Sequence, residues 1–375
     1  MENNQLNSLN NSLNSQSKDI NINGLKTDFN IEKIISAEDF KTEAEKQLQQ
    51  FNEAGESKGL FIVKTGNRWI EQAKTRPIPQ MLFGEFWFEG ELCILFADTN
   101  LGKSILAVQI GNSISRGEQI RGFKLEAPPQ PILYFDFELS DKQFENRYSK
   151  QFEQHYNFDN NFIRVEINPD ATIPETQGFE NYLNHSLERS INETGAKVLI
   201  IDNLTYLKNE TEKAKDALPL MKHLKALKNK YGLSILALAH TPKRDLSKPI
   251  NRNDLQGSKM LINFCDSSFS IGESNIDKSL RYLKQIKARN TEILFDAENV
   301  CVCQIDKPIN FLQFEFMNFG KEWEHLKLYT DKDKEDMKEK VIELKQKGRS
   351  LREIGTELNI SHMKVSRILK DCNKL

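Results

Sequence analysis

The segment LFADTNLGKSILA, residues 95–107, holds a Gly-Lys-Ser tripeptide between an apolar run and a stretch with helical spacing. We predict a strand at 92–96 and a helix at 104–115, which puts the tripeptide at a strand-to-helix turn. A turn of this kind points backbone N–H groups and the positive end of the helix dipole toward a bound phosphate. Ala97 stands where the pattern Gly-x-x-x-x-Gly-Lys-Ser/Thr has its first glycine.

The alanine is compatible with a phosphate-binding loop, because the chain has only to enter the turn there with a negative φ. Gly102 is expected to let the backbone approach the phosphates, Lys103 to contact the β- and γ-phosphates, and the Ser104 hydroxyl to ligate Mg2+. We therefore predict a site for ATP and Mg2+; a chance Gly-Lys-Ser at an ordinary turn is the alternative. The residues predicted to surround the nucleotide are Asp98, Thr99, Asn100, Leu101, Gly102, Lys103, Ser104 and Ile105.

Length and composition exclude several classes of protein. The 375 residues, 38% of them hydrophobic, suffice for one large and one small folded domain. The sequence has no apolar run of membrane-spanning length and does not start like a signal peptide, which predicts a cytoplasmic protein without a membrane partner. Its 5 cysteines include no C-x-x-C pair, so neither a zinc site nor a disulfide framework is indicated. A net charge of -2 gives no global attraction to nucleic acid.

The chain divides into five predicted parts. They are a disordered Asn- and Ser-rich tail (1–30), a helical segment (31–63), an ATPase domain (64–330), a charged linker (331–336) and a helix-turn-helix domain (337–375). Within the large domain, apolar runs alternate with helix-period segments, which predicts an α/β fold with a mainly parallel sheet. Its buried parallel strands are expected at 92–97, 131–135, 198–201 and 233–239. An antiparallel extension is expected at 280–288, 293–295, 300–305 and 311–317.

A phosphate loop needs a second strand that ends in a metal-binding carboxylate, and KVLIIDNLTYL supplies Asp202 after four apolar residues. Asn203 occupies the place where many ATPases carry the glutamate that activates water, and an amide cannot accept a proton. We therefore expect the base in PILYFDFELSDKQ, with Glu138 as the base and Asp136 as its polar neighbour on the same side. A turn aspartate and a surface-capping glutamate are the alternatives.

These parts and their order resemble the RecA-like P-loop NTPase fold, in particular the RepA/DnaB-like branch of hexameric helicases and its AAA family ATPase relatives on mobile elements. The resemblance covers about residues 64–310. It implies that Glu138 is the catalytic glutamate, which in this family follows the second core strand. His240, which ends LSILALAH, then corresponds to the residue that senses the γ-phosphate; a structural hydrogen-bond donor is the alternative.

The resemblance also implies a homo-oligomer, with a hexameric ring as the expected form. Family members carry a Lys-x-Arg pair that reaches the ATP of the neighbouring subunit, and Lys287 and Arg289 in LKQIKARN match it. Being two residues apart, they share one face of a strand; a solvated basic strand is the alternative. The chain departs from the family at Ala97 and in lacking a recognisable helicase N-terminal domain, which leaves strand unwinding open.

The segment between His240 and Asp266 is rich in basic residues, and RecA-like rings place loops of this position against a central channel. Cations in such a loop can follow a phosphate backbone, which predicts DNA as the partner. A plain solvated loop is the alternative. The basic residues predicted to bind DNA here are Lys243, Arg244, Lys248, Arg252 and Lys259.

The C-terminal stretch GRSLREIGTELNISHMKVSRILKDCNKL is predicted to form a helix-turn-helix similar to those of resolvases. Ser350 and Glu353 form a capping box, small Gly355 lets the two helices cross, and Asn359 and Ser361 suit the turn and the second helix start. The outward residues predicted to bind DNA are His362, Lys364 and Arg367. A helical hairpin that docks a protein is the alternative.

Together these features predict a DNA-dependent ATPase, a RepA-like replicative or mobilisation helicase or translocase of a plasmid or mobile element. One alternative is a DNA-binding regulator that uses ATP as an assembly switch. Another is a recombination or signalling ATPase similar to RadA or KaiC.

Overall fold

The computed structural model describes residues 61–172, 178–204, 217–242, 244–255, 258–328, 331–358, 360 and 362–372. The chain divides into two units, Met1–Ile78 and Pro79–Leu375. The described part of the first unit contains α3 (Gly66–Lys74), which buries none of its residues. The unit boundary lies after residue 78, whereas the ATPase domain was predicted to begin at residue 64. The predicted tail at 1–30 and the helical segment up to residue 60 lie outside the described residues.

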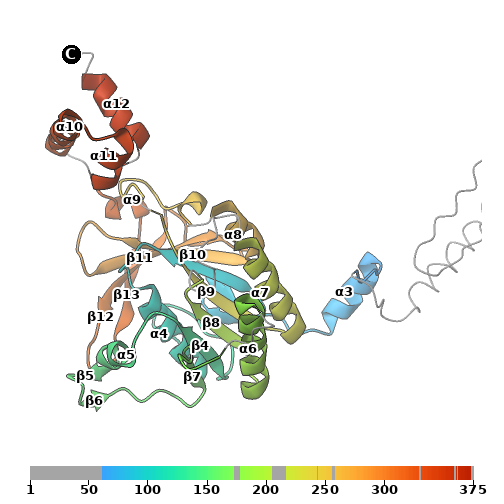
Figure 1. The fold of residues 1–375 in the computed structure, drawn as a ribbon. Helices are drawn as coiled ribbons and strands as arrows, with labels where there is room; N and C mark the ends of the chain where they lie inside the picture. The colour runs from blue at the N-terminus through green and yellow to red at the C-terminus, as the bar shows by residue number, and fades with distance from the viewer. Residues whose placement is uncertain are drawn as a thin grey trace, which may run out of the picture. The chain divides into compact units, whose positions relative to one another are not determined.

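In the described part of the second unit, nine strands form one mixed sheet (Figure 1). In spatial order they are β13 (Gln313–Gly320), β12 (Val300–Asp306), β11 (Leu280–Lys287), β10 (Ser267–Glu273), β3 (Leu92–Ala97), β9 (Ser234–His240), β8 (Val198–Asp202), β4 (Ile132–Asp136) and β7 (Phe162–Val165). The strands from β10 to β7 are parallel, and β11, β12 and β13 continue the sheet antiparallel. The predicted α/β class, with a mainly parallel sheet and an antiparallel extension, is confirmed.

The predicted strands differ from the observed ones in two respects. The prediction missed β7 and β10, and it placed a strand at 293–295 where the chain forms a loop. In that loop the Leu294 and Phe295 amides donate to the Gln285 side chain at 2.8 and 2.9 Å, so a side chain replaces a neighbouring strand as their partner. Only the first residue of β7, Phe162, is buried, which hides its apolar pattern.

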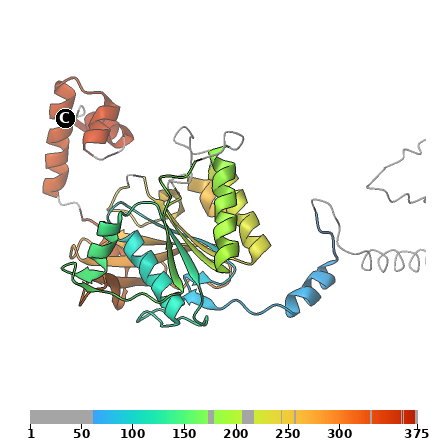
Figure 2. The ribbon, with the colours of Figure 1, turned by 60° about the horizontal axis from the view of Figure 1, so that its bottom comes forward.

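Helices cover both faces of the sheet, and the two-residue period of each strand decides which helices its side chains meet. Along β3, Cys93 and Leu95 belong to the apolar cluster under α4, whereas Ile94 and Phe96 belong to the cluster on the opposite face. All of β3 is buried, as expected for a central strand. The covering helices are α4 (Lys103–Arg116) on one face and α6 (Phe179–Thr194), α7 (Ala217–Tyr231) and α8 (Ser258–Phe264) on the other (Figure 2).

The order of the parallel strands brings four strand ends to one edge of the sheet. β9 lies between β3 and β8, and β4 follows β8. Ala97 at the end of β3 pairs with His240 at the end of β9, and Asp202 at the end of β8 pairs with Asp136 at the end of β4. Side chains that are far apart in the sequence therefore meet at this edge.

Within the described residues, no helix has both the length and the apolar character needed to cross a bilayer.

Shorter elements surround the sheet, and α5 among them starts with a capping box between Ser140 and Gln143. The shorter elements are β1 (Met81–Phe83), β2 (Trp87–Phe88), α5 (Asp141–Arg147), β5 (Ser149–Lys150), β6 (Gln154–His155), the 3-10 helix η3 (Arg252–Asp254) and α9 (Glu322–His325).

The last described helices have an apolar cluster of their own, centred on Val341, Ile354 and Val365. They are α10 (Asp331–Gln346), α11 (Leu351–Glu357) and α12 (His362–Cys372). The predicted capping box opens α11: the Ser350 hydroxyl accepts from the Glu353 amide at 3.3 Å, and the Glu353 carboxylate accepts from the Ser350 amide at 2.8 Å.

The charged run at 331–336, predicted as a linker, is instead helical and begins α10. Alternating acidic and basic residues suit an exposed helix as well as a linker, so this pattern did not separate the two. A Cβ on Gly355 would lie 2.7 Å from the Ile360 carbonyl oxygen, so a glycine in α11 leaves room for the turn before α12. The predicted turn residues 359 and 361 lie outside the described residues.

Candidate nucleotide site

The predicted phosphate loop connects β3 to α4. Ala97 is the last residue of β3, so an alanine fits where the usual pattern has glycine. Asn100 has a φ of 63° and Gly102, the N-cap of α4, a φ of 94°. A Cβ on Gly102 would lie 2.9 Å from the Ile305 and Phe314 side chains, so packing against β12 and β13 requires glycine as well as the positive φ.

Lys103 is buried at the end of this loop, with 7% of its surface exposed. Its ammonium donates to the carbonyl oxygens of Ala97 at 3.1 Å and Asp98 at 3.0 Å, and lies 3.2 Å from Nδ1 of His240. Burial lowers the pKa of Lys103, although the carboxylates of Asp202 and Glu138 act in the opposite direction. The hydrogen-bond partners of this cation are neutral groups, which an anionic phosphate can replace.

Asp202 lies beside the start of α4, with 1% of its surface exposed. Its Oδ2 accepts a hydrogen bond of 2.6 Å from the Tyr134 hydroxyl. Burial raises the pKa of Asp202 to about 6, and hydrogen bonds from the Ser104 and Tyr134 hydroxyls oppose this shift. A serine hydroxyl beside a carboxylate is a suitable donor set for Mg2+.

Within the described residues, no group of three or more His, Cys, Asp and Glu side chains could hold a metal ion by themselves. Mg2+ at a nucleotide site takes most of its ligands from phosphate oxygens and water, and so needs few protein ligands. Ser104 and Asp202 are therefore the residues that would hold it.

Glu138 follows β4 and turns toward the ends of β8 and β9. Its Oε1 accepts a short hydrogen bond from the Asn203 amide and lies 3.5 Å from Nε2 of His240. The hydrogen bond from His240 lowers the pKa of Glu138. Because Nδ1 of His240 accepts from Lys103, we assign the proton of the neutral ring to Nε2, which then donates to Glu138. His240 thus links the loop lysine to the candidate base.

Asp136 does not share this arrangement. Its carboxylate accepts from Arg164 at 2.9 Å and from the Glu138 and Leu139 amides at 3.2 and 3.0 Å. Asp136 is thus a polar neighbour of Glu138 through the Glu138 backbone, and its second oxygen is paired with Arg164. β7 pairs with β4 on the side away from β8, and it brings Arg164 to this carboxylate.

Lys287 and Arg289 lie at the opposite edge of the sheet, because β11 runs antiparallel to β10. The Lys287 ammonium donates to the carbonyl oxygens of Ile262 and Cys265, each at 2.6 Å. The Arg289 guanidinium donates to Asp266 at 3.0 Å and remains half exposed. The end of β11 thus lies at the edge of the sheet opposite the end of β3, where the nucleotide loop begins.

The basic segment after β9 exposes Lys248 and Arg252, whereas Arg244 is half buried and donates to the Lys248 carbonyl oxygen at 3.1 Å. Between Lys248 and Arg252, side chains fix the backbone at Ile250. Its amide donates to Glu322 at 2.6 Å, and its carbonyl accepts from Lys284 at 2.7 Å. Of the other predicted cations, residue 243 lies outside the described residues and residue 259 lies in α8.

In the last helix, His362 and Arg367 are exposed, Lys364 is half buried and Val365 is buried in the apolar cluster. The burial pattern therefore agrees with the predicted outward positions of His362 and Arg367, whereas the Lys364 ammonium lies 3.9 Å from the Asp245 carboxylate.

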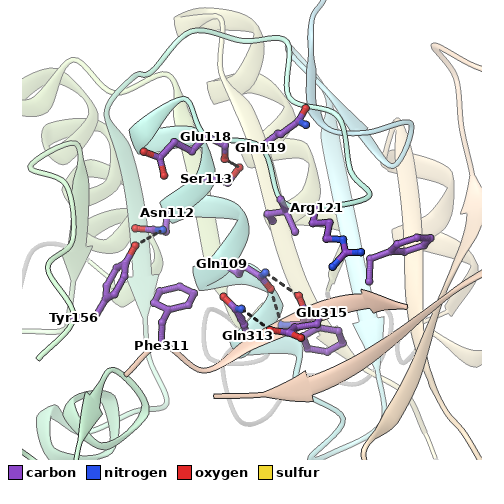
Figure 3. Close-up of a pocket in the computed structure, with 13 residues that line it drawn as sticks. Gln109, Asn112, Ser113, Glu118, Gln119, Arg121, Tyr156, Phe311, Gln313 and Glu315 are labelled. Atoms are coloured by element: carbon purple, nitrogen blue, oxygen red, sulfur yellow. Dashed lines mark hydrogen bonds between the residues drawn. The ribbon is translucent and has the colours of Figure 1, made fainter. Parts of the chain in front are cut away.

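A cavity of about 340 Å³ lies elsewhere, along the middle of α4 (Figure 3). The Gln109 side chain exchanges two hydrogen bonds with the Phe314 backbone at 2.9 and 2.8 Å, and Asn112 donates to the Tyr156 hydroxyl at 3.0 Å. These inner polar groups satisfy one another, so we assign no ligand to this cavity.

Two residues near the nucleotide loop were missed as members of the site. Tyr134 lies inside a buried strand, where nothing in the local pattern distinguishes it from a core aromatic residue. The sequence indicates for Asn203 only that it cannot be the base, but its side-chain amide bonds to Glu138 and lies 3.2 Å from Nε2 of His240. An amide directly after the metal-site carboxylate was the available signal.

One strand separates the strand that enters the phosphate loop from the strand that ends in the buried carboxylate. With the loop leading directly into α4, this topology defines a RecA-like P-loop NTPase. A sequence profile of the AAA domain family matches residues 56–245, just over half of the 375 residues. The chain belongs to this family and is a P-loop ATPase.

A comparison with curated proteins finds no match. Among solved structures, the chain is similar to a KaiC-like protein from the hyperthermophilic archaeon Pyrococcus horikoshii OT3. The sequence identity is 14%, the TM-score is 0.41, and the match covers 61% of this chain and 90% of that chain.

Proposed function

We propose that the protein hydrolyses MgATP at the loop between β3 and α4. Lys103 binds the β- and γ-phosphates, and Ser104 and Asp202 hold Mg2+. Glu138 accepts a proton from the water that attacks the γ-phosphorus, which breaks the bond to the ADP oxygen and leaves inorganic phosphate. His240 senses the γ-phosphate.

The hydrogen-bond network supports these roles. His240 contacts Lys103 at 3.2 Å and Glu138 at 3.5 Å, so a change at the phosphate-binding lysine reaches the base through one side chain. When a phosphate attracts Lys103, Nδ1 of His240 loses its hydrogen-bond donor, and the hydrogen bond between Nε2 of His240 and Glu138 changes as a result. During this change, the hydrogen bond from the Asn203 side chain keeps the Glu138 carboxylate beside the ends of β8 and β9.

We further propose that hydrolysis is coupled to DNA. The observation that carries this proposal is the three-helix cluster at the C-terminus, whose helix α12 exposes Arg367 opposite buried Val365. A helix of this pattern suits the major groove, where an arginine can bond the guanine edge. The exposed cations Lys248 and Arg252 after β9 suit contact with a phosphate backbone.

On this proposal the protein is a replicative or mobilisation helicase or translocase of a plasmid or mobile element, acting as a homo-oligomeric ring. Lys287 and Arg289 then serve the ATP of the neighbouring subunit. Their distance from the nucleotide loop of their own chain is compatible with a role in trans.

The test is ATP turnover with no DNA, with single-stranded DNA and with duplex DNA, alongside strand displacement from a forked substrate. DNA-stimulated turnover with displacement supports a helicase, and stimulation without displacement supports a translocase. Turnover that neither DNA changes contradicts the coupling. The Lys103→Ala variant is the control for contaminating ATPase.

The exposed face of α12 also favours a second candidate, a regulator that recognises a DNA site and uses ATP as an assembly switch. This candidate predicts tight binding to one duplex sequence and slow turnover that DNA does not stimulate. Selection of binding sites from random duplexes distinguishes the two functions.

A further inference from the structure

Tyr134 is a fully buried residue in the centre of β4. Its ring stacks on Phe162 of the neighbouring β7, with ring centroids 5.9 Å apart. Its hydroxyl donates to Oδ2 of Asp202 at 2.6 Å. A buried tyrosine normally finds a partner for its hydroxyl, but a carboxylate at a metal site is a partner with chemical consequences.

Strand register explains how the two side chains meet. β4 and β8 are parallel, and Tyr134 pairs with Ile200 while Asp136 pairs with Asp202. Tyr134 and Ile200 both belong to the apolar cluster under α4. Since side chains alternate along a strand, Asp202 faces the same side, and Tyr134 reaches it diagonally from the core. Ser104 at the start of α4 also hydrogen-bonds this carboxylate.

We propose that Tyr134 is a positioning residue that orients Asp202 for the Mg2+ of the bound nucleotide, an inference that rests on the proposed ATPase function. By occupying Oδ2, the Tyr134 hydroxyl fixes the rotation of the carboxylate and directs its other oxygen away from the core. Tyr134 itself contacts neither nucleotide nor metal. Loss of a hydrogen-bond partner behind a metal ligand typically costs about 10- to 100-fold in metal affinity.

The chain offers a matched control in Tyr148, whose exposed fraction is 3%. Its ring packs among Phe144, Phe158 and Phe311. Within the described residues, its buried hydroxyl has no hydrogen-bond partner. Tyr148→Phe and Tyr134→Phe therefore remove the same group from similar surroundings, but only Tyr134→Phe removes a bond to Asp202.

The experiment uses the full chain with ADP and measures bound Mn2+ by electron paramagnetic resonance. Tyr134→Phe is expected to raise the Mn2+ concentration for half-saturation about tenfold, while Tyr148→Phe leaves it unchanged. A fluorescent ADP analogue in EDTA should bind wild type and both variants alike, because the effect acts through the metal. An equal Mn2+ shift in both variants, or none in Tyr134→Phe, overturns the proposal.

An Asp202→Asn background guards against a folding artefact, because the substitution there leaves no carboxylate oxygen unpaired. In that background Tyr134→Phe should not weaken Mn2+ binding further; a further weakening means that Tyr134 acts through packing and contradicts the proposal. Wild-type protein that binds neither ADP nor Mn2+ refutes the ATPase function itself. Normal wild-type binding with an unaffected Tyr134→Phe refutes only the role of Tyr134.

Discussion

The two edges of the sheet both gather charged side chains from strand ends, but they satisfy them differently. At the edge formed by the carboxyl ends of the parallel strands, here called the carboxyl edge, Lys103 donates to two backbone carbonyls and lies beside the imidazole of His240. At the opposite edge, Asp266 accepts from Lys228 at 2.9 Å, Arg289 at 3.0 Å and the Leu92 amide at 3.0 Å.

The pKa shifts follow this difference. Burial lowers the pKa of Lys103, because its neutral partners do not compensate for lost hydration. Burial also works to raise the pKa of Asp266, but the Leu92 amide, Lys228 and Arg289 together hold it below its ordinary value. A ligand site thus differs from a structural cluster in leaving charge for the ligand to neutralise. By this criterion the edge with Lys103 suits an anionic ligand, whereas at the opposite edge Asp266 is already paired with Lys228 and Arg289.

The largest expected effect comes from Arg289. If it serves the neighbouring subunit, Arg289→Ala lowers ATP turnover by about 10³- to 10⁵-fold, the usual contribution of an arginine finger. Lys228→Ala is the control, because it removes another partner of Asp266 and leaves Arg289 in place. Steady-state phosphate release measures both variants. Equal losses would mean that the opposite edge is purely structural.

Mixing inactive subunits extends this test to the assembly. Arg289→Ala and Glu138→Gln chains should regain turnover together, since some interfaces then contain both wild-type residues. Mixtures that never exceed the sum of the separate variants would contradict a shared site.

Glu138→Gln is expected to lower turnover by about 10²- to 10⁴-fold while MgATP still binds, because the amide cannot accept a proton. Single-turnover hydrolysis and equilibrium nucleotide binding separate the two effects. Glu145→Gln, on the nearby helix α5, keeps full turnover, since Glu145 pairs with Lys142 and His155. Near-normal turnover in Glu138→Gln would assign the base elsewhere.

Asp202→Asn tests whether the carboxyl edge is under electrostatic strain. The pKa of Asp202 in the folded protein, about 6, lies above the ordinary 3.8. The charged carboxylate therefore destabilises the fold; this destabilisation is complete above pH 6 and absent below about pH 4. The variant should therefore gain on the order of 2 to 3 kcal/mol in unfolding free energy at pH 8 and nothing at pH 4. Urea unfolding without nucleotide or metal measures both.

Asp136→Asn should lower the unfolding free energy at pH 8, the opposite of Asp202→Asn, because the buried Asp136 carboxylate is paired with Arg164 at 2.9 Å. Destabilisation by Asp202→Asn at pH 8 would contradict the difference drawn between the two kinds of cluster.

The smallest expected effect concerns the C-terminal helices. Arg367→Ala should cost about 1 to 3 kcal/mol of duplex affinity at a preferred site, and Lys364→Ala should weaken all sequences alike and reduce the salt slope by about one. Removal of residues 329–375 deletes the C-terminal helices from before the start of α10 at Asp331. It should leave basal ATP turnover intact and abolish the preference for one duplex sequence. Duplex binding at two salt concentrations measures all three; unchanged affinity and salt dependence would make the helices a protein-docking module.

Local sequence anticipated much of this protein because the relevant signals are short. Gly102-Lys103-Ser104 stands at the predicted strand-to-helix turn, with Gly102 as the N-cap of α4, and the Ser350 and Glu353 capping box opens α11. Local pattern failed where two states share it. The charged run at 331–336 suited a linker as well as a helix, and the apolar run at 293–295 suited a strand until Gln285 bound its amides.

The sequence by itself determined the central strands β3, β4, β8 and β9, the phosphate loop and which polar residues end those strands. Only the tertiary structure decided that β9 lies between β3 and β8, which puts His240 beside Lys103. It also decided that the Tyr134 hydroxyl donates to Asp202 and that Arg164 donates to Asp136. The physical reason is that strand order and register arise from the packing of distant apolar faces, whereas propensity, turn chemistry and the two-residue alternation act within a few residues of the chain.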